Sequence, residues 1–221
     1  MDVALSPSTR LELDHVLMAV TDLAAAAALL EGRFGLASAD GGRHAAWGTA
    51  NRIVPLGESY LELVTVVDEL AAAKSTFGRW VAAMRSRSGR LIGWAARTTD
   101  LDSVASRLDL GISDGSRRDP SGAELRWRGA GIEAAAAQPA RPFFIEWDPR
   151  TPYPGHLAVA HPAGAVELAR LELSGDPVRL AEWLGARWLP IVVRPGEPAV
   201  TRLILRAGER EIVLGAADAA G

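Results

Sequence analysis

Cysteine is absent from all 221 residues of this chain. Its absence excludes disulfide bonds, thiolate metal ligands and cysteine nucleophiles together. The chain also lacks a run of about 20 apolar residues, the length that a membrane helix requires. The N-terminal segment MDVALSPSTR has no apolar core of the kind found in signal peptides. We therefore expect a cytoplasmic protein with no membrane partner.

Neither the charge nor the short motifs indicate a nucleotide or nucleic-acid partner. The formal net charge is −3 and the basic residues are spread along the chain, so we expect no nucleic-acid binding. The patterns of P-loops, dinucleotide folds, serine hydrolases and zincins are all missing. A hydrophobic content of 48% is enough for a real core, and seven tryptophans exceed what a small core demands. Some tryptophans are therefore expected to line an apolar pocket.

The segment 11–66 is the most informative part of the chain. It reads LELDHVLMAV, TDLAAAAALLEGRFG, GGRHAAWGTANRIVPLG and ESYLELVTVV, which predicts a strand, a helix and three further strands. The helix begins after Thr21 or Asp22, either of which can cap it. Strand periodicity places His15 among apolar residues. The residues expected to share its face are Leu11, Leu13, Leu17 and Ala19.

A glutamate lies in the last of these strands, where Tyr60, Glu62 and Val64 point to one face. A carboxylate in so apolar a strand requires a cation, a donor or water. If the first and last strands pair in one curved sheet, His15 and Glu62 meet in its hollow, where a divalent metal would satisfy both. The alternative is a hydrogen-bonded core histidine and a glutamate paired with an arginine such as Arg52.

A βαβββ unit with histidine in its first strand and glutamate in its last resembles a module of the vicinal oxygen chelate superfamily. The LDHV, GGRHAAWGTANRIVPLG and YLELV segments, followed by PFFIEWD and AHPAGAV, are similar to the glyoxalase-like domain family. This resemblance covers residues 11–164. It implies an α+β fold in which paired βαβββ modules form curved mixed sheets around a cavity, and it leaves the reaction open.

The resemblance also implies a metal site. Superfamily sites usually take four protein ligands from two modules, or two histidines and one carboxylate from one module. Here only His15, Glu62 and Glu146 occupy matching positions, which would suit Zn, Mn, Fe or Ni. The missing ligand is equally compatible with a loss of metal binding.

The remainder of the chain divides by the same patterns. After a first module at 11–66, we expect a linker helix at 67–89, a second module at 90–148, a loop at 149–165 and a degenerate third module at 166–216. Alignment of the two TDL segments matches His15 to Gly93, so the second module lacks the histidine. The third unit has a βαβββ pattern without ligand residues. The run Arg117-Arg118-Asp119 is most simply a solvated hairpin.

Five further residues are candidates for the site. His44 could act as a general base near pH 7, because the unperturbed pKa of histidine is about 6.5, or it could be a polar residue on an edge strand. Asn51 could donate to a substrate carbonyl or to the backbone. Trp47 could form the cavity wall or the core, and Tyr60 shares the face of Glu62. Arg141 could pair with a substrate carboxylate or lie on a plain surface connection.

These residues favour a metal-assisted enzyme acting on a small oxygenated molecule. The metal would act as a Lewis acid while Glu62 or His44 moves a proton, an outcome that covers lyase, isomerase and dioxygenase reactions. The alternative is a non-catalytic protein that binds or sequesters a small molecule in the same cavity, with Trp47, Trp94 and Trp147 as its walls. We expect a monomer or a homodimer, and association through the edges of the C-terminal strands is a third possibility.

Overall fold

The computed structural model describes residues 10–215. The first βαβββ unit forms as the sequence pattern predicts, with a short 3-10 turn (Ala45–Trp47) before its third strand. Its elements are β1 (Leu11–Ala19), α1 (Leu23–Phe34), β2 (Ala39–His44), β3 (Thr49–Pro55) and β4 (Tyr60–Val66). Asp22 caps α1 by accepting the N–H groups of Ala24 and Ala25, and the left-handed Gly35 ends the helix.

The second unit follows after two helices rather than the single expected one. The helical segment is interrupted just before Ser75, whose hydroxyl caps the second helix. It continues without interruption through Gly78. The elements are α2 (Glu69–Ala72), α3 (Thr76–Met84), β5 (Arg90–Thr98), α4 (Leu101–Leu108), β6 (Ile112–Arg118), β7 (Glu124–Ala130), α5 (Ile132–Ala137) and β8 (Phe143–Trp147). The short helix α5 is an addition that the strand pattern did not predict.

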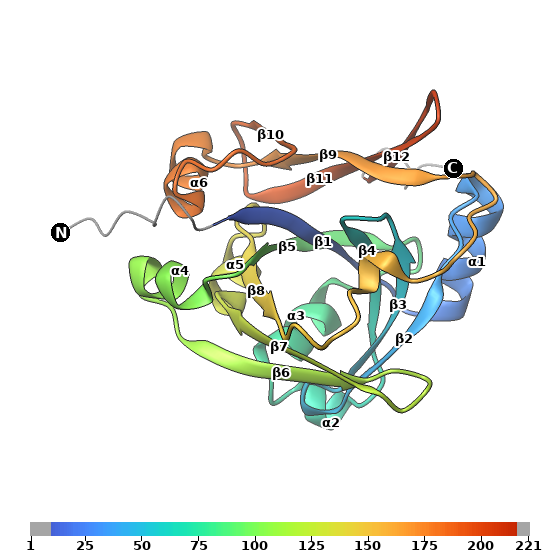
Figure 1. Cartoon of the computed structure of the whole chain (residues 1–221), viewed down its shortest axis with the longest axis horizontal. Coiled ribbons are helices and arrows are strands. Elements are labelled where there is room, and N and C mark those ends of the chain that lie inside the picture. The colour runs from blue at the N-terminus through green and yellow to red at the C-terminus, as the bar shows by residue number, and fades with distance from the viewer. Residues whose placement is uncertain (1–9, 216–221) are drawn as a thin grey trace.

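The eight strands of the two units close into one barrel in the order β1-β4-β3-β2-β6-β7-β8-β5 (Figure 1). Within each unit the first and last strands pair in parallel, and β1 and β5 join the units as antiparallel neighbours. On the opposite side, β2 and β6 share one register pair, Arg43 with Arg118. This closure confirms the predicted curved sheets around a cavity.

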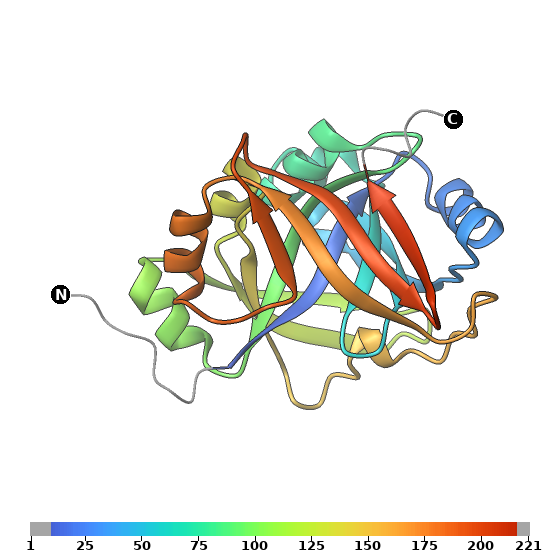
Figure 2. The same cartoon turned by 90° about the horizontal axis from the view of Figure 1, so that it is seen from above.

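A second sheet covers the outer face of the barrel at β1 and β5 (Figure 2). It is built from β9 (Val166–Ser174), β10 (Ile191–Arg194), β11 (Ala199–Ala207) and β12 (Arg210–Gly215), with α6 (Pro177–Leu184) after its first strand. The strand order is β10-β9-β11-β12, so the last strand of this unit, β12, lies at an edge of the sheet and does not pair with the first, β9. In the first barrel unit, by contrast, the last strand β4 pairs with the first strand β1. The third unit therefore repeats the element order of the modules with a different pairing.

A β-bulge in β1 decides which of its side chains enter the barrel. The register with β5 shifts between Leu13 and His15, at Asp14. Before the bulge, Leu11 and Leu13 pack with Val16 in the core between the sheets. After it, His15 and the residues at 17 and 19 face the barrel interior. The prediction of a single face from position 11 to position 19 was therefore wrong, because one extra residue reverses the alternation.

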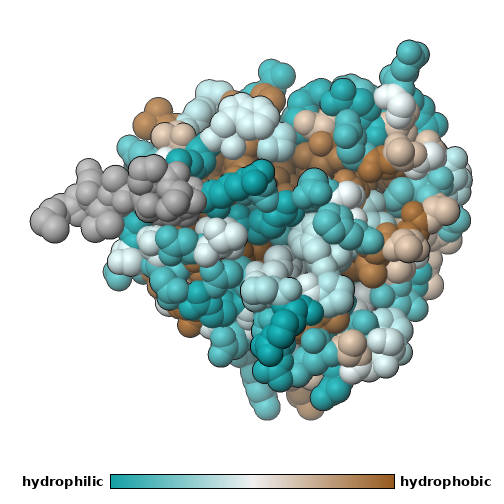
Figure 3. Space-filling model, in the orientation of Figure 1, coloured by the Kyte–Doolittle hydropathy of each residue, from teal (hydrophilic) through white to brown (hydrophobic). Residues whose placement is uncertain are grey.

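The surface seen in Figure 3 carries hydrophobic side chains in separate areas among hydrophilic ones. The outer side of the second sheet bears ion pairs, among them Arg206 with Glu167 and Arg170 with Glu211. None of the helices within residues 10–215 is long and apolar enough to cross a membrane.

Candidate functional site

The barrel holds a small inner pocket that adjoins a wide surface groove. The pocket has a volume of about 30 Å³ and the groove about 1410 Å³. Five side chains border both spaces and form the neck between them: His44, Trp47, Arg117, Trp127 and Trp147. Since this pocket has room for only about two water molecules, a larger molecule can enter only if the neck side chains move.

The pocket brings together the two residues that the sequence paired. His15 Nε2 lies 3.5 Å from Glu62 Oε2, and both side chains are almost fully buried. The parallel pairing of β1 with β4 sets Tyr60 opposite His15 and Glu62 opposite Leu17, so imidazole and carboxylate project from neighbouring strands into one hollow. The two rings of His15 and Tyr60 stack at 4.7 Å. The bulge aims His15 at this position.

Asp14 fixes the orientation of the His15 ring. Its Oδ1 lies 2.5 Å from His15 Nδ1, and its Oδ2 accepts the indole N–H of Trp147 at 3.0 Å. An Asp14 carboxylate requires a donor, which assigns a hydrogen to Nδ1; in the neutral ring Nε2 is then an acceptor toward Glu62. Sequence reasoning missed Asp14 as a functional residue. The sequence carried a signal, since an aspartate directly before the histidine interrupts a largely apolar strand.

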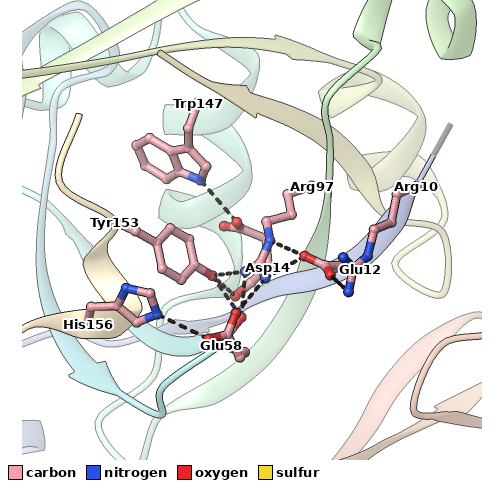
Figure 4. A network of polar contacts seen from close by, with 8 residues as sticks. All are labelled: Arg10, Glu12, Asp14, Glu58, Arg97, Trp147, Tyr153 and His156. Atoms are coloured by element: carbon pink, nitrogen blue, oxygen red, sulfur yellow. Dashed lines mark hydrogen bonds and ion pairs between the residues drawn. The ribbon is translucent and has the colours of Figure 1, made fainter. Parts of the chain in front are cut away.

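The backbone around Asp14 is held by the loop that crosses this end of the barrel (Figure 4). The Tyr153 hydroxyl lies 3.2 Å from the Asp14 carbonyl and receives a hydrogen bond from Arg97 at 2.7 Å. Arg97 also donates to Glu12 on β1, at 2.6 Å. Burial, followed by the charge of Asp14, raises the pKa of Tyr153 far above its usual value, so its phenol remains protonated. The loop 149–165 is thereby tied to the bulge.

Asn51 positions the second oxygen of Glu62. Its Nδ2 donates to Glu62 Oε1 at 2.7 Å. The amide must be oriented in this way, because a carboxylate oxygen can only accept a hydrogen bond. Its Oδ1 is buried without a partner among the described residues and faces Gly41, where an added Cβ would lie only 2.1 Å away. Arg52, the alternative partner for Glu62, instead binds the Asp40 carboxylate and the backbone carbonyl of Ser38, just before β2. Glu62 Oε2 is therefore left to face His15.

Tyr60 and His44 are both held in their neutral forms. Burial raises the pKa of Tyr60 well above its usual value, and the charges of Asp14 and Glu62 add to the rise. Burial lowers the pKa of His44 to about 4, helped by the cation of Arg117 and opposed by Glu62. His44 is therefore a weak base at pH 7. The prediction that it is poised to accept a proton near neutrality does not agree with this environment.

The buried His44 predicts a loss of stability in mild acid. Below pH 6.5 the unfolded chain protonates this histidine, while the folded chain does so only near pH 4. The unfolded state then binds more protons, so the free energy of unfolding falls as the pH drops from 6.5 to 4. The contribution of His44 is about 3 kcal/mol over that window. Urea unfolding at several pH values should show a shallower fall for His44→Gln, and parallel curves for both proteins would contradict this prediction.

Arg117 also lies in this site, contrary to the prediction of a solvated hairpin. It is 5% exposed and borders both the pocket and the groove, whereas its neighbour Arg118 is exposed. The reason is strand alternation in β6, which points residue 117 into the barrel and residue 118 out of it.

Three other predicted residues lie elsewhere. Glu146 points out of the barrel, where it accepts from Arg128 at 2.8 Å, because in β8 it is Phe143, Ile145 and Trp147 that face inward. Arg141 stacks its guanidinium on Trp183 of α6 at 4.8 Å and does not border the pocket. Trp94 is fully buried between the barrel and the second sheet, where its indole donates to the Ala140 carbonyl at 3.0 Å.

The donor set does not complete the predicted metal site. His15 and Glu62 are spaced as two ligands of one ion could be, but the third expected ligand, Glu146, is on the other side of the sheet wall. No group of three histidine, aspartate or glutamate side chains able to hold an ion occurs among the described residues. Catalytic zinc sites use three protein ligands, and here the cation of Arg117 borders the same pocket.

Comparison with known sequences identifies one family. The family model described as "Glyoxalase-like domain" matches residues 13–189, a span that contains all but the first two residues of the barrel and the beginning of the third unit. No curated protein matches the chain.

Solved structures match most of this chain or a part of it. A hypothetical protein from Staphylococcus aureus aligns with a TM-score of 0.69 at 14% identity, and the alignment covers 91% of this chain and 93% of that chain. Methylmalonyl-CoA epimerase from Mycobacterium tuberculosis aligns with a TM-score of 0.44 at 21% identity, covering 63% of this chain and 89% of that one. The first of these matches includes the second sheet in the shared fold.

Proposed function

Because the chain belongs to the glyoxalase-like domain family of the vicinal oxygen chelate superfamily, we propose that it is an enzyme that moves a proton on a small enolisable carbonyl compound. The observation that carries this proposal is the 3.5 Å separation of His15 Nε2 and Glu62 Oε2. Each atom is left as an acceptor by a buried partner on its other side, Asp14 for the imidazole and Asn51 for the carboxylate. Two facing acceptors form a place for a transferable proton.

In the proposed reaction Glu62 takes the proton from the carbon next to the substrate carbonyl. The electrons of the broken C–H bond form the enolate, and the negative charge develops on the carbonyl oxygen. Glu62 then passes this proton to His15 Nε2, 3.5 Å away, and the imidazolium that forms lies between the carboxylates of Asp14 and Glu62. Return of a proton to carbon completes either an isomerisation of the substrate or an exchange of its hydrogen with solvent. Neither outcome requires an oxidant.

The surroundings support this chemistry. Aromatic side chains wall the pocket and exclude water, so charge interactions within it are strong. The rings are Trp47, Tyr60, Phe77, Trp127, Phe143 and Trp147. His44 lies 3.1 Å from the Thr49 hydroxyl through Nδ1. When that hydroxyl donates, His44 Nε2 carries its hydrogen and can donate to the developing enolate oxygen, a role that a neutral imidazole suits.

Deuterium exchange tests the proposal directly. Protein dialysed against EDTA is incubated in D₂O with a panel of small ketones, hydroxyketones and 2-oxo acids, and proton NMR follows the loss of the hydrogen next to the carbonyl. We expect exchange above the buffer rate for at least one class of compound, and a loss of that exchange in His15→Gln. A panel that exchanges equally with wild type and variant would contradict the proposal.

The aromatic walls favour a second candidate, a binding protein for a small apolar molecule. The same spectra separate the two functions, since line broadening or saturation transfer reports binding of a compound whether or not its hydrogen exchanges. Binding without exchange across the panel would favour the second function.

A further inference from the structure

Arg117 has no task in the fold that the described residues reveal. Its side chain is 5% exposed on β6, at the neck between groove and pocket. Within residues 10–215 no hydrogen bond or ion pair joins its guanidinium to an acceptor, although its charge acts on His44, Tyr60 and the carboxylate of Asp119. Every other buried ionic side chain of the site has a close partner, since Asp14 is bound by His15 and Glu62 by Asn51.

A guanidinium at so buried a position is costly without a close anion, because it has lost most of its water. None of its nitrogens is among the fully buried atoms without a partner, so they remain accessible from the neck. The nearby carboxylate does not fill this need, as one oxygen of Glu62 accepts from Asn51 and the other faces His15. We propose that Arg117 is the binding site for the carboxylate of a small acid, which makes the substrate class the 2-oxo acids with an enolisable carbon. The assignment of the substrate class rests on the proposed function. The assignment of an anion site rests only on the burial and position of Arg117.

The charge of the site favours a carboxylate over a phosphate. One guanidinium supplies one positive charge, and its planar fork matches the two oxygens of a carboxylate. Glu62 in the same pocket and Asp14 behind His15 are negative, while burial holds His44 and Tyr60 neutral. Because these carboxylates already offset the charge of Arg117, a monoanion adds less negative charge to this apolar pocket than a dianion would.

The position of Arg117 also sets the direction of the ligand. A carboxylate held at the neck leaves the rest of a short molecule to enter the pocket, where His15 and Glu62 lie. The enolisable carbon of a 2-oxo acid is two bonds from the carboxylate carbon. The length of such an acid thus places its exchangeable hydrogen beyond the neck, on the side of the two proton-transfer groups.

Calorimetric titration with pyruvate and with 2-oxobutyrate tests the assignment. We expect Arg117→Gln to weaken binding of both acids by about 10- to 100-fold, the loss typical of a hydrogen-bonded charge. Arg117→Lys should bind with intermediate affinity, because it retains the charge without the fork. The matched control is Arg118→Gln, which alters the adjacent exposed arginine and should leave affinity unchanged. Methyl pyruvate, which lacks the carboxylate, should bind all four proteins equally.

The outcomes separate this inference from the proposed function. If Arg117→Gln remains folded by circular dichroism and binds the acids as tightly as wild type, the carboxylate site is refuted even where deuterium exchange succeeds. If Arg117→Gln does not fold, the affinity of Arg117→Lys against Arg118→Gln decides the question. Equal binding of inorganic phosphate and pyruvate would refute the preference for a carboxylate. Loss of affinity in Arg117→Gln without any exchange would support the anion site and contradict catalysis.

Discussion

Replacement of Glu62 by glutamine is expected to lower substrate deuterium exchange by about 10²- to 10⁴-fold, the usual contribution of a positioned general base. The glutamine keeps the size of the side chain, and its carbonyl can still accept from Asn51 as Glu62 Oε1 does at 2.7 Å. Its amide NH₂ then occupies the place of Oε2 and donates to His15 Nε2. Both acceptors are lost in one substitution, while the pocket retains its shape and its hydrogen bonds.

Glu146→Gln is the matched control for this prediction. Glu146 is also a glutamate in the last strand of a barrel unit, but it faces outward and binds Arg128. Its replacement should leave the exchange rate unchanged, since no atom of it borders the pocket. Equal exchange rates in wild type and Glu62→Gln, with both proteins folded, would show that Glu62 is not the general base.

The contrast between these two glutamates shows how far the sequence pattern reaches. Period-two alternation correctly predicted that Tyr60, Glu62 and Val64 share a face, because β4 is regular and buried on both sides. The same rule placed Glu146 opposite Ile145 and Trp147. What it could not tell is which face of β8 turns inward, since that depends on the register of β8 with β5 and β7 and on closure of the barrel.

The two missed residues of the site have similar explanations. Asp14 enters the site through a bulge, and a bulge depends on the partner strand β5 more than on the sequence of β1. Arg117 lies in a strand of largely polar residues, so alternation carried no signal of a buried face. Its burial results from the meeting of β6 with β2 across the barrel, a contact between residues far apart in the chain. Long-range closure decided both positions.

Asp14→Asn is the second substitution with a large expected effect, a decrease in exchange of about 10²- to 10⁴-fold through the tautomer of His15. The asparagine can accept the Trp147 indole N–H with its carbonyl, as Asp14 Oδ2 does at 3.0 Å. Its NH₂ group then faces His15 Nδ1, where Asp14 Oδ1 lay at 2.5 Å. A donor at that position forces the hydrogen of the ring onto Nε2. The imidazole then donates to Glu62 and can no longer accept a proton.

This effect is one of positioning, because Asp14 acts through His15 and does not border the pocket. Nitrogen-15 spectra of histidine-labelled protein should show the Nδ1–H form of His15 in the wild type and the Nε2–H form in Asp14→Asn, with the melting temperature little changed. A purely structural role would lower stability and leave the tautomer as it was. Wild-type exchange rates in an Asp14→Asn protein that carries the Nε2–H form would show that His15 does not move the proton, and would leave Glu62 as the sole acceptor.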